Sequence, residues 1–156
     1  MTARRRAGAG GCLAAALVLV LAGCVPDSGG VPGRLERGLA SADSNAQTAS
    51  LALRELSAGR TTPQQAHTAI DDALTKLGEE RAGLAGVEPA TPAERRWRSG
   101  ADDAIGELDA ALKDARAAVA GGAGIRWSQA RREVADASDA LEHARRTIIR
   151  QGGEAE

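Results

Sequence analysis

The chain has 156 residues, and its 20 lysines and arginines nearly balance its 21 aspartates and glutamates, which leaves a formal net charge of −1 at pH 7. It contains two tryptophans and neither phenylalanine nor tyrosine. A protein that reads nucleic acid is expected to present a basic face with aromatic stacking residues, so this composition argues against a nucleic-acid partner.

The first 24 residues have the three parts of a secretory signal peptide. Arginines at positions 4–6 precede an apolar stretch from about Leu13 to Ala22, and small residues end it. This stretch is about half the ~20 residues that a membrane-spanning helix needs, so it is a poor permanent anchor. The arginines favour the cytoplasmic side, which predicts that the chain after residue 23 is exported.

The run Leu21-Ala22-Gly23-Cys24 closes this segment. It resembles the lipobox of bacterial lipoproteins. The resemblance implies cleavage between Gly23 and Cys24, a lipid with palmitate-type chains on the Cys24 sulfur, and a mature protein anchored to the cell membrane on its extracytoplasmic side. An ordinary secretory cleavage site or a short membrane helix are the alternatives, and the export route, Sec or twin-arginine, stays open.

The cysteines exclude several kinds of chemistry from the mature protein. Cys12 lies in the segment that is removed, and Cys24 is expected to carry lipid. No free thiol is then left for a disulfide, a thiolate metal site or a cysteine nucleophile. Three arginines leave with the leader, so 17 basic residues remain against 21 acidic ones, a net charge of −4. The remaining length suits one small domain.

Four segments follow from the composition along the chain. Residues 1–23 are the signal peptide, and 24–33 are the lipidated cysteine with a flexible tether, because two prolines and three glycines fall within 25–33. Residues 34–151 are the helical domain, and 152–156 are a disordered tail. Within the domain, apolar positions recur with a seven-residue spacing in four blocks, which predicts four helices.

The first two blocks each place apolar residues on one face. The second opens with Thr62-Pro63-Gln64-Gln65, the pattern of a capping box with proline in the first turn. The first block carries Leu35, Leu39, Ala42, Ala46, Ala49, Leu53 and Leu56. The second carries Ala66, Ile70, Ala73, Leu77 and Leu84, widened by Leu74.

The third and fourth blocks repeat this arrangement. The third opens with Thr91-Pro92-Ala93-Glu94 and stops at Gly121-Gly122, and the fourth runs from about Arg126 to Gln151. The third block carries Trp97, Ala101, Ala104, Leu108, Ala111 and Ala115, widened by Ile105, Leu112 and Val119. The fourth carries Trp127, Ala130, Val134, Ala137, Leu141, Ala144 and Ile148.

Four helices joined by short turns pack most simply as antiparallel neighbours. The sequence therefore predicts an all-α protein, an antiparallel up-down-up-down four-helix bundle with alanine-rich heptad seams, preceded by a signal-peptide helix. Neither alternating apolar and polar runs nor clusters of β-branched and aromatic residues, the signals of strands, occur in the mature chain.

Catalytic, metal and cofactor sites are not predicted. Asp136, Asp139 and His143 share a helix face, but His143 lies about 200° around the helix from Leu141 and faces solvent. His67 lies beside the apolar stripe of the second block. The paired carboxylates Asp71-Asp72 and Asp102-Asp103 diverge by about 100° per residue, so neither pair can flank one bond. We expect no enzyme activity.

Arginines form the remaining candidate binding site. In the predicted bundle one end combines the starts of the first and third helices with the ends of the second and fourth. The candidates for contact with anionic lipid headgroups are Arg95, Arg96, Arg98, Arg145, Arg146 and Arg150. Three further arginines belong to the same end, namely Arg34, Arg37 and Arg81. Six glutamates also lie there and are expected to cancel much of the charge, namely Glu36, Glu79, Glu80, Glu88, Glu94 and Glu142.

These observations favour a lipid-anchored helical bundle that acts as a protein-interaction or structural module at the cell envelope, with the membrane and an envelope protein as partners. The alternative is a small-ligand or metal-binding helical carrier at the membrane surface. A carrier needs a cavity of more than ~300 Å³ between its helices.

Overall fold

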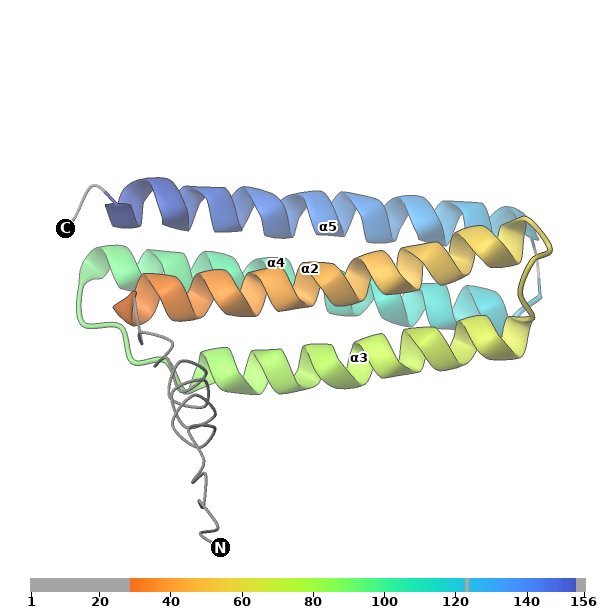
Figure 1. Ribbon diagram of the computed structural model, residues 1–156, viewed down its shortest axis with the longest axis horizontal. Helices are drawn as coiled ribbons and strands as arrows, with labels where there is room; N and C mark the ends of the chain where they lie inside the picture. The colour runs from red at the N-terminus through yellow and green to blue at the C-terminus, as the bar shows by residue number, and fades with distance from the viewer. Residues whose placement is uncertain (1–28, 123, 154–156) are drawn as a thin grey trace, which may run out of the picture.

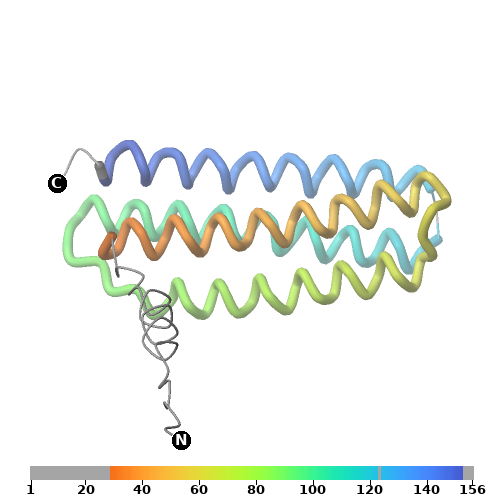
Figure 2. The backbone as a smooth tube through the Cα atoms, in the orientation of Figure 1, coloured from red at the N-terminus to blue at the C-terminus, as the bar shows by residue number. Residues whose placement is uncertain are grey.

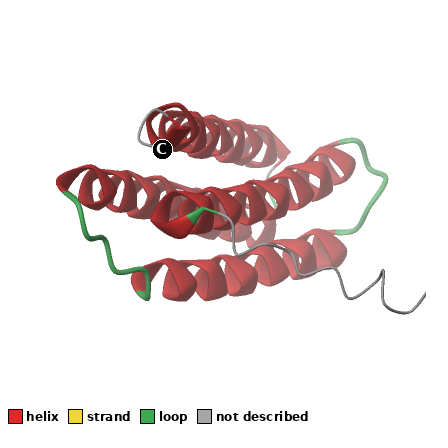
Figure 3. Ribbon diagram, turned by 60° about the vertical axis from the view of Figure 1, so that its left-hand side comes forward, coloured by secondary structure: helices red, strands yellow, loops and turns green. Residues whose placement is uncertain are grey.

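The computed structural model describes residues 29–122 and 124–153, and these residues form four helices joined by short loops (Figure 1). Their bounds are α2 Gly30–Ser57, α3 Pro63–Ala85, α4 Pro92–Ala120 and α5 Gly124–Gly153. Figure 3 shows only helices and loops in the described part of the chain. The predicted all-α class is confirmed.

The four helices run alternately up and down, so that consecutive helices are antiparallel (Figure 2). Each helix contacts the next in the sequence, and α2 also contacts α5, which closes the bundle. Of the two diagonal pairs, α2 touches α4, whereas α3 and α5 make no contact within the described residues. Helices α2 and α4, which are diagonal to each other and run in the same direction, therefore contact each other across the centre of the bundle. Helices α3 and α5 lie outside this pair.

The core contains most of the residues that the apolar spacing predicts, with Val31, Val87 and Ala118 in addition. Of the 29 apolar residues that are buried in the described part of the chain, 12 are alanines, and the larger ones are mainly leucine, isoleucine and valine. An alanine removes little area from water, so the helices must approach closely for these larger side chains to touch. Three predicted core residues are only partly buried, namely Leu74, Trp127 and Ala144. Buried Gly38, opposite Leu84, belongs to the core without having been predicted.

Both predicted capping boxes are present. In α3, the backbone N–H of Gln65 donates to Thr62 Oγ1 over 3.2 Å, and the N–H of Thr62 donates to Gln65 Oε1 over 3.2 Å. In α4, the N–H of Glu94 donates to Thr91 Oγ1 over 3.1 Å, and the N–H of Thr91 donates to Glu94 Oε2 over 2.9 Å. Each box satisfies amides that a helix start otherwise leaves unpaired.

Two predicted boundaries differ from the structure. Helix α2 begins at Gly30, so the expected tether is at least four residues shorter, because Val31 is buried and Pro32 fits a first helical turn. Helix α5 continues to Gly153, two residues beyond the expected end. A side-chain carbon on Gly152 would lie 3.2 Å from Pro32 Cβ, so the last turn of α5 packs closely against the first turn of α2.

The predicted signal peptide, its cleavage site at Gly23 and Cys24, and residues 154–156 of the expected tail lie outside the described residues. Among the described helices, none has the length and apolarity that crossing a membrane requires.

Candidate functional site

The predicted arginine-rich end is formed as the topology requires. The first turns of α2 and α4 and the last turns of α3 and α5 lie together at one end of the bundle, which we call the proximal end because the chain enters α2 there (Figure 1). The opposite end, with the α2–α3 and α4–α5 loops, is the distal end.

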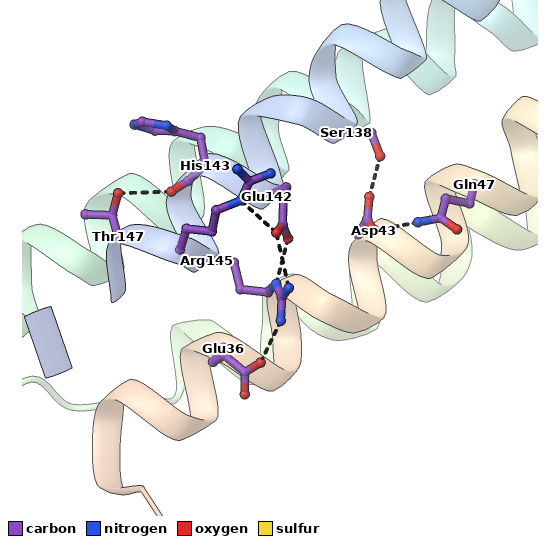
Figure 4. A network of polar contacts seen from close by, with 9 residues as sticks. Glu36, Asp43, Gln47, Ser138, Glu142, His143, Arg145 and Thr147 are labelled. Carbon is purple, nitrogen blue, oxygen red and sulfur yellow. Dashed lines mark hydrogen bonds and ion pairs between the residues drawn. The ribbon is translucent and has the colours of Figure 1, made fainter. Parts of the chain in front are cut away.

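Arg145 links α5 to α2 at the proximal end. Its Nη1 lies 3.0 Å from Glu36 Oε1, and its Nε lies 2.7 Å from Glu142 Oε2 (Figure 4). Arg146 Nε binds the same carboxylate, 2.8 Å from Glu142 Oε1. Hydrogen bonds from Arg145 and then Arg146 lower the pKa of Glu142 to about 2, and the hydrogen bonds to Glu142 and Glu36 raise the pKa of Arg145. Both arginines are therefore already paired within the protein.

Polar contacts join all four pairs of neighbouring helices at this end. We call them the proximal ring. They are Arg145–Glu36 between α5 and α2, Ser41–Glu80 at 2.7 Å between α2 and α3, Arg81–Asp102 at 3.1 Å between α3 and α4, and Trp97–Gln151 at 2.7 Å between α4 and α5. Local spacing does not predict this ring, because its members are up to 109 residues apart in the sequence.

The arginines of the proximal end fall into two groups, those with an interaction partner, to which Arg37 also belongs, and those without one among the described residues. Arg98 donates from Nη2 to the carbonyl oxygen of Ala85 over 3.1 Å and so satisfies the end of α3. With Arg81, Arg145 and Arg146, it belongs to the group held by internal partners. Within the described part of the chain, no ion pair or side-chain hydrogen bond involves the exposed side chains of the other group, which we call the unpaired arginines: Arg34, Arg95, Arg96 and Arg150.

The nearby carboxylates are mostly engaged as well. Glu36, Glu80 and Glu142 take part in the contacts above. Glu94 accepts from the backbone amides of Thr91 and Ala90, and these hydrogen bonds lower its pKa. The charge cancellation expected at this end therefore acts chiefly on Arg145, Arg146 and Arg81, and much less on the unpaired arginines.

The other titratable residues that the sequence pointed to lie on the outer faces of the described helices. Asp136, Asp139 and His143 are exposed on α5, and no three His, Cys, Asp or Glu side chains of the described residues are placed to hold a metal ion. His67 Nδ1 lies 2.9 Å from Asp71 Oδ2, and Arg116 Nη1 lies 3.4 Å from Asp71 Oδ1. These are contacts on the outer faces of α3 and α4.

Among the grooves that open to solvent beside α5 in the described part of the chain, two are of particular size. One, of about 560 Å³, lies between α2 and α5, and its floor includes buried Ala46 and Val134. The other, of about 750 Å³, lies between α4 and α5 and includes Trp97, Gly100 and His143. Both exceed the volume set for a carrier, but they are surface grooves bordered by exposed residues, so they do not supply the cavity between helices that a carrier needs.

Comparisons of the chain with protein families, curated proteins and solved structures found no match.

Proposed function

We propose that this protein is a lipid-anchored, extracytoplasmic helical bundle that acts as an interaction or structural module at the cell envelope. The observation that carries the proposal is the run Leu21-Ala22-Gly23-Cys24 at the end of an apolar leader with arginines at its start. The bundle supports it, because α2 begins only six residues after Cys24. An extended chain of that length spans about 20 Å, so the lipid would hold the proximal end close to the membrane.

In that position the unpaired arginines would meet the headgroups. They come from three helices, with Arg34 on α2, Arg95 and Arg96 on α4, and Arg150 on α5. Each basic residue near an anionic surface contributes about 1 kcal/mol of attraction. Ile149, which is 49% exposed beside Arg150, adds apolar surface at the same end. We therefore assign headgroup contact to these four arginines and not to Arg98, Arg145 and Arg146, which have internal partners.

The rest of the surface would face away from the lipid, towards other envelope proteins. A carrier is the less supported alternative, because the grooves beside α5 are open to solvent.

A two-chain lipid on Cys24 holds a protein stably at a membrane, whereas a single chain holds it only marginally. A module anchored in this way needs no membrane-spanning helix.

The anchor is tested by expressing the full chain in a bacterial host with a clickable palmitate analogue. We expect label in the wild type and in Cys12→Ala, and no label in Cys24→Ala, because only the Cys24 sulfur is the acceptor. Cys12→Ala is the matched control, since it also removes a leader-region cysteine. Mass spectrometry of the purified protein should find a diacylated Cys24 as the first residue. An unmodified sulfur at Cys24, or equal label in Cys24→Ala, would refute the anchor.

A further inference from the structure

The groove between α2 and α5 lies in the distal half of the bundle and is open because both helices carry small residues there. Ala46 and Ser50 on α2 face Ala135 and Ser138 on α5 across it. At its proximal limit, Ser138 Oγ of α5 donates to Asp43 Oδ1 of α2 and so bridges the two helices (Figure 4). Gln47 Nε2, on α2 itself, donates to Asp43 Oδ2 over 2.7 Å. The distal part of the groove has no such bridge among the described residues.

Three arginines border this groove. Arg54 stands on the α2 side, and Arg131 and Arg132 stand on the α5 side. Arg54 is 59% exposed and reaches only its neighbour Glu55, at 3.4 Å. In the described part of the chain, no ion pair or hydrogen bond involves the side chains of Arg131 and Arg132. One aspartate, Asp139, is also in the lining. The groove is thus locally basic on a protein whose net charge is negative.

An apolar side chain accompanies this charge. Leu51 is 48% exposed and lies on the α2 side of the groove, one helical turn from Arg54. Of the described residues, only Leu51, Ile125 and Ile149 are large, apolar and exposed, and only Leu51 belongs to this groove. A partner that covers Leu51 removes water around the arginines, which strengthens their pairing with carboxylates.

We infer that this groove docks a segment of another envelope protein that carries Asp or Glu side chains beside an apolar one. The inference rests on the proposed anchor, since the lipid would hold the proximal end at the membrane and leave this distal groove open to partners. A basic groove selects acidic partners by charge complementarity, which contributes more to specificity and association rate than to affinity.

Two other occupants fit less well. A small anion would stay hydrated, because Arg54 and Arg132 are exposed and Arg131 is only half-buried. A second copy related by a two-fold axis would present the same surface, with three arginines against one aspartate, so the two faces would carry like net charge and would not complement each other.

The test uses the purified full chain in micelles of a zwitterionic detergent and measures fluorescence anisotropy of a labelled peptide of repeated Leu-Glu-Glu-Ala units. We expect saturable binding, an affinity at least tenfold lower for the peptide with Gln in place of Glu, and an affinity about tenfold lower for Arg131→Gln with Arg132→Gln, since two ion pairs are lost. The matched control, Lys76→Gln with Arg126→Gln, removes the same charge from exposed positions outside the groove and should bind as the wild type does.

Several results would overturn the inference. Absence of saturable binding excludes the docking site, and equal losses in both double variants indicate general charge attraction. Competition by inorganic phosphate as effective as that of the peptide assigns the groove to a small anion. A dimer in native mass spectrometry that dissociates in Arg131→Gln with Arg132→Gln assigns it to a second copy. Peptide binding is measured whether or not Cys24 carries lipid, so failure of docking and failure of the anchor are read separately.

Discussion

The two ends of the bundle are held by different kinds of contact. At the proximal end, the ring of polar contacts joins each neighbouring pair of helices, including Arg145 with Glu36 and Trp97 with Gln151. At the distal end, Arg116 of α4 lies 3.4 Å from Asp71 of α3, but the other polar contacts lie mainly within loops or across one turn of chain. Arg60 Nε binds Glu55 Oε2 at 2.5 Å inside the α2–α3 connection, and Trp127 Nε1 donates to the carbonyl oxygen of Ala118 over 3.1 Å.

This difference indicates which end depends on the complete fold. Contacts of the proximal ring form only when helices distant in sequence have the right rotation and depth. Distal contacts such as Arg60–Glu55 join residues five apart and can form as the loop does. The end that carries the unpaired arginines is therefore also the end where side-chain contacts join every pair of neighbouring helices.

Substitution of the two tryptophans provides the largest test of this comparison. Trp97 is 9% exposed and completes the proximal ring, whereas Trp127 is only partly buried. We expect Trp97→Ala to lower the free energy of unfolding by about 3–5 kcal/mol, through lost burial and the cavity left behind, and Trp127→Ala to lower it less. Urea denaturation followed by circular dichroism measures both. Equal losses of unfolding free energy in the two variants would contradict the difference between the two ends.

Two glycine substitutions are expected to change the free energy of unfolding by smaller amounts and in opposite directions. A Cβ on Gly38 would lie 3.0 Å from Leu84 Cδ2, so the bulkier Gly38→Val overpacks the contact of α2 with α3 and should cost about 1–3 kcal/mol. A Cβ on Gly100 meets nothing within 4 Å, so Gly100→Ala should stabilise α4 by about 0.5–1 kcal/mol, because glycine is a poor residue inside a helix. Thermal unfolding compares the two variants, and a stabilising Gly38→Val would contradict the packing described.

The parts of the fold that sequence could predict are those that depend on local spacing. Leu35 to Leu56 on α2 and the capping boxes at Thr62 and Thr91 follow from periodicity and short motifs, and the structure confirms them. Helix ends that depend on a neighbour were wrong: α2 begins earlier because Val31 is buried, and α5 continues past Gln151 because its end packs against α2.

From the sequence, only the end of the bundle that carries the candidate site could be predicted, and not which of its arginines have internal partners. Topology placed the arginines at one end, but whether an arginine has an internal partner depends on helix rotation. Arg145 meets Glu36 across 109 residues, while Arg95 and Arg96 have no such partner among the described residues. The basic groove was not foreseen, because its arginines come from helices at opposite ends of the sequence, and its opening depends on which small residues face each other.

Acid should loosen the proximal end through Glu142. Its pKa is lowered to about 2 by Arg145 and Arg146, from an ordinary value of 4.5. The ionised form is therefore favoured in the folded protein, and the resulting stability is present above about pH 4.5 and is lost as the pH falls towards 2. We expect Glu142→Gln to melt at a lower temperature than the wild type at pH 7, with the difference narrowing steadily as the pH falls from 4.5 towards 2. A difference of undiminished size at pH 2 would point to packing and not to ionisation.

The unpaired arginines should have the smallest effect on folding and a clear effect on membrane contact. Arg95 and Arg96 are exposed, and no ion pair or hydrogen bond with the described residues is lost when both become Gln, so the stability should change by less than about 0.5 kcal/mol. Association of the protein, freed of its lipid, with vesicles rich in phosphatidylglycerol should nevertheless fall, because two charges that attract the surface are removed. Vesicle flotation measures it, with Lys76→Gln and Arg126→Gln as the charge-matched control. Equal flotation of the two double variants would mean that net charge alone governs binding. A selective loss in the Arg95 and Arg96 variant, with unfolding unchanged, would show that the proximal end keeps these side chains for a partner outside the fold.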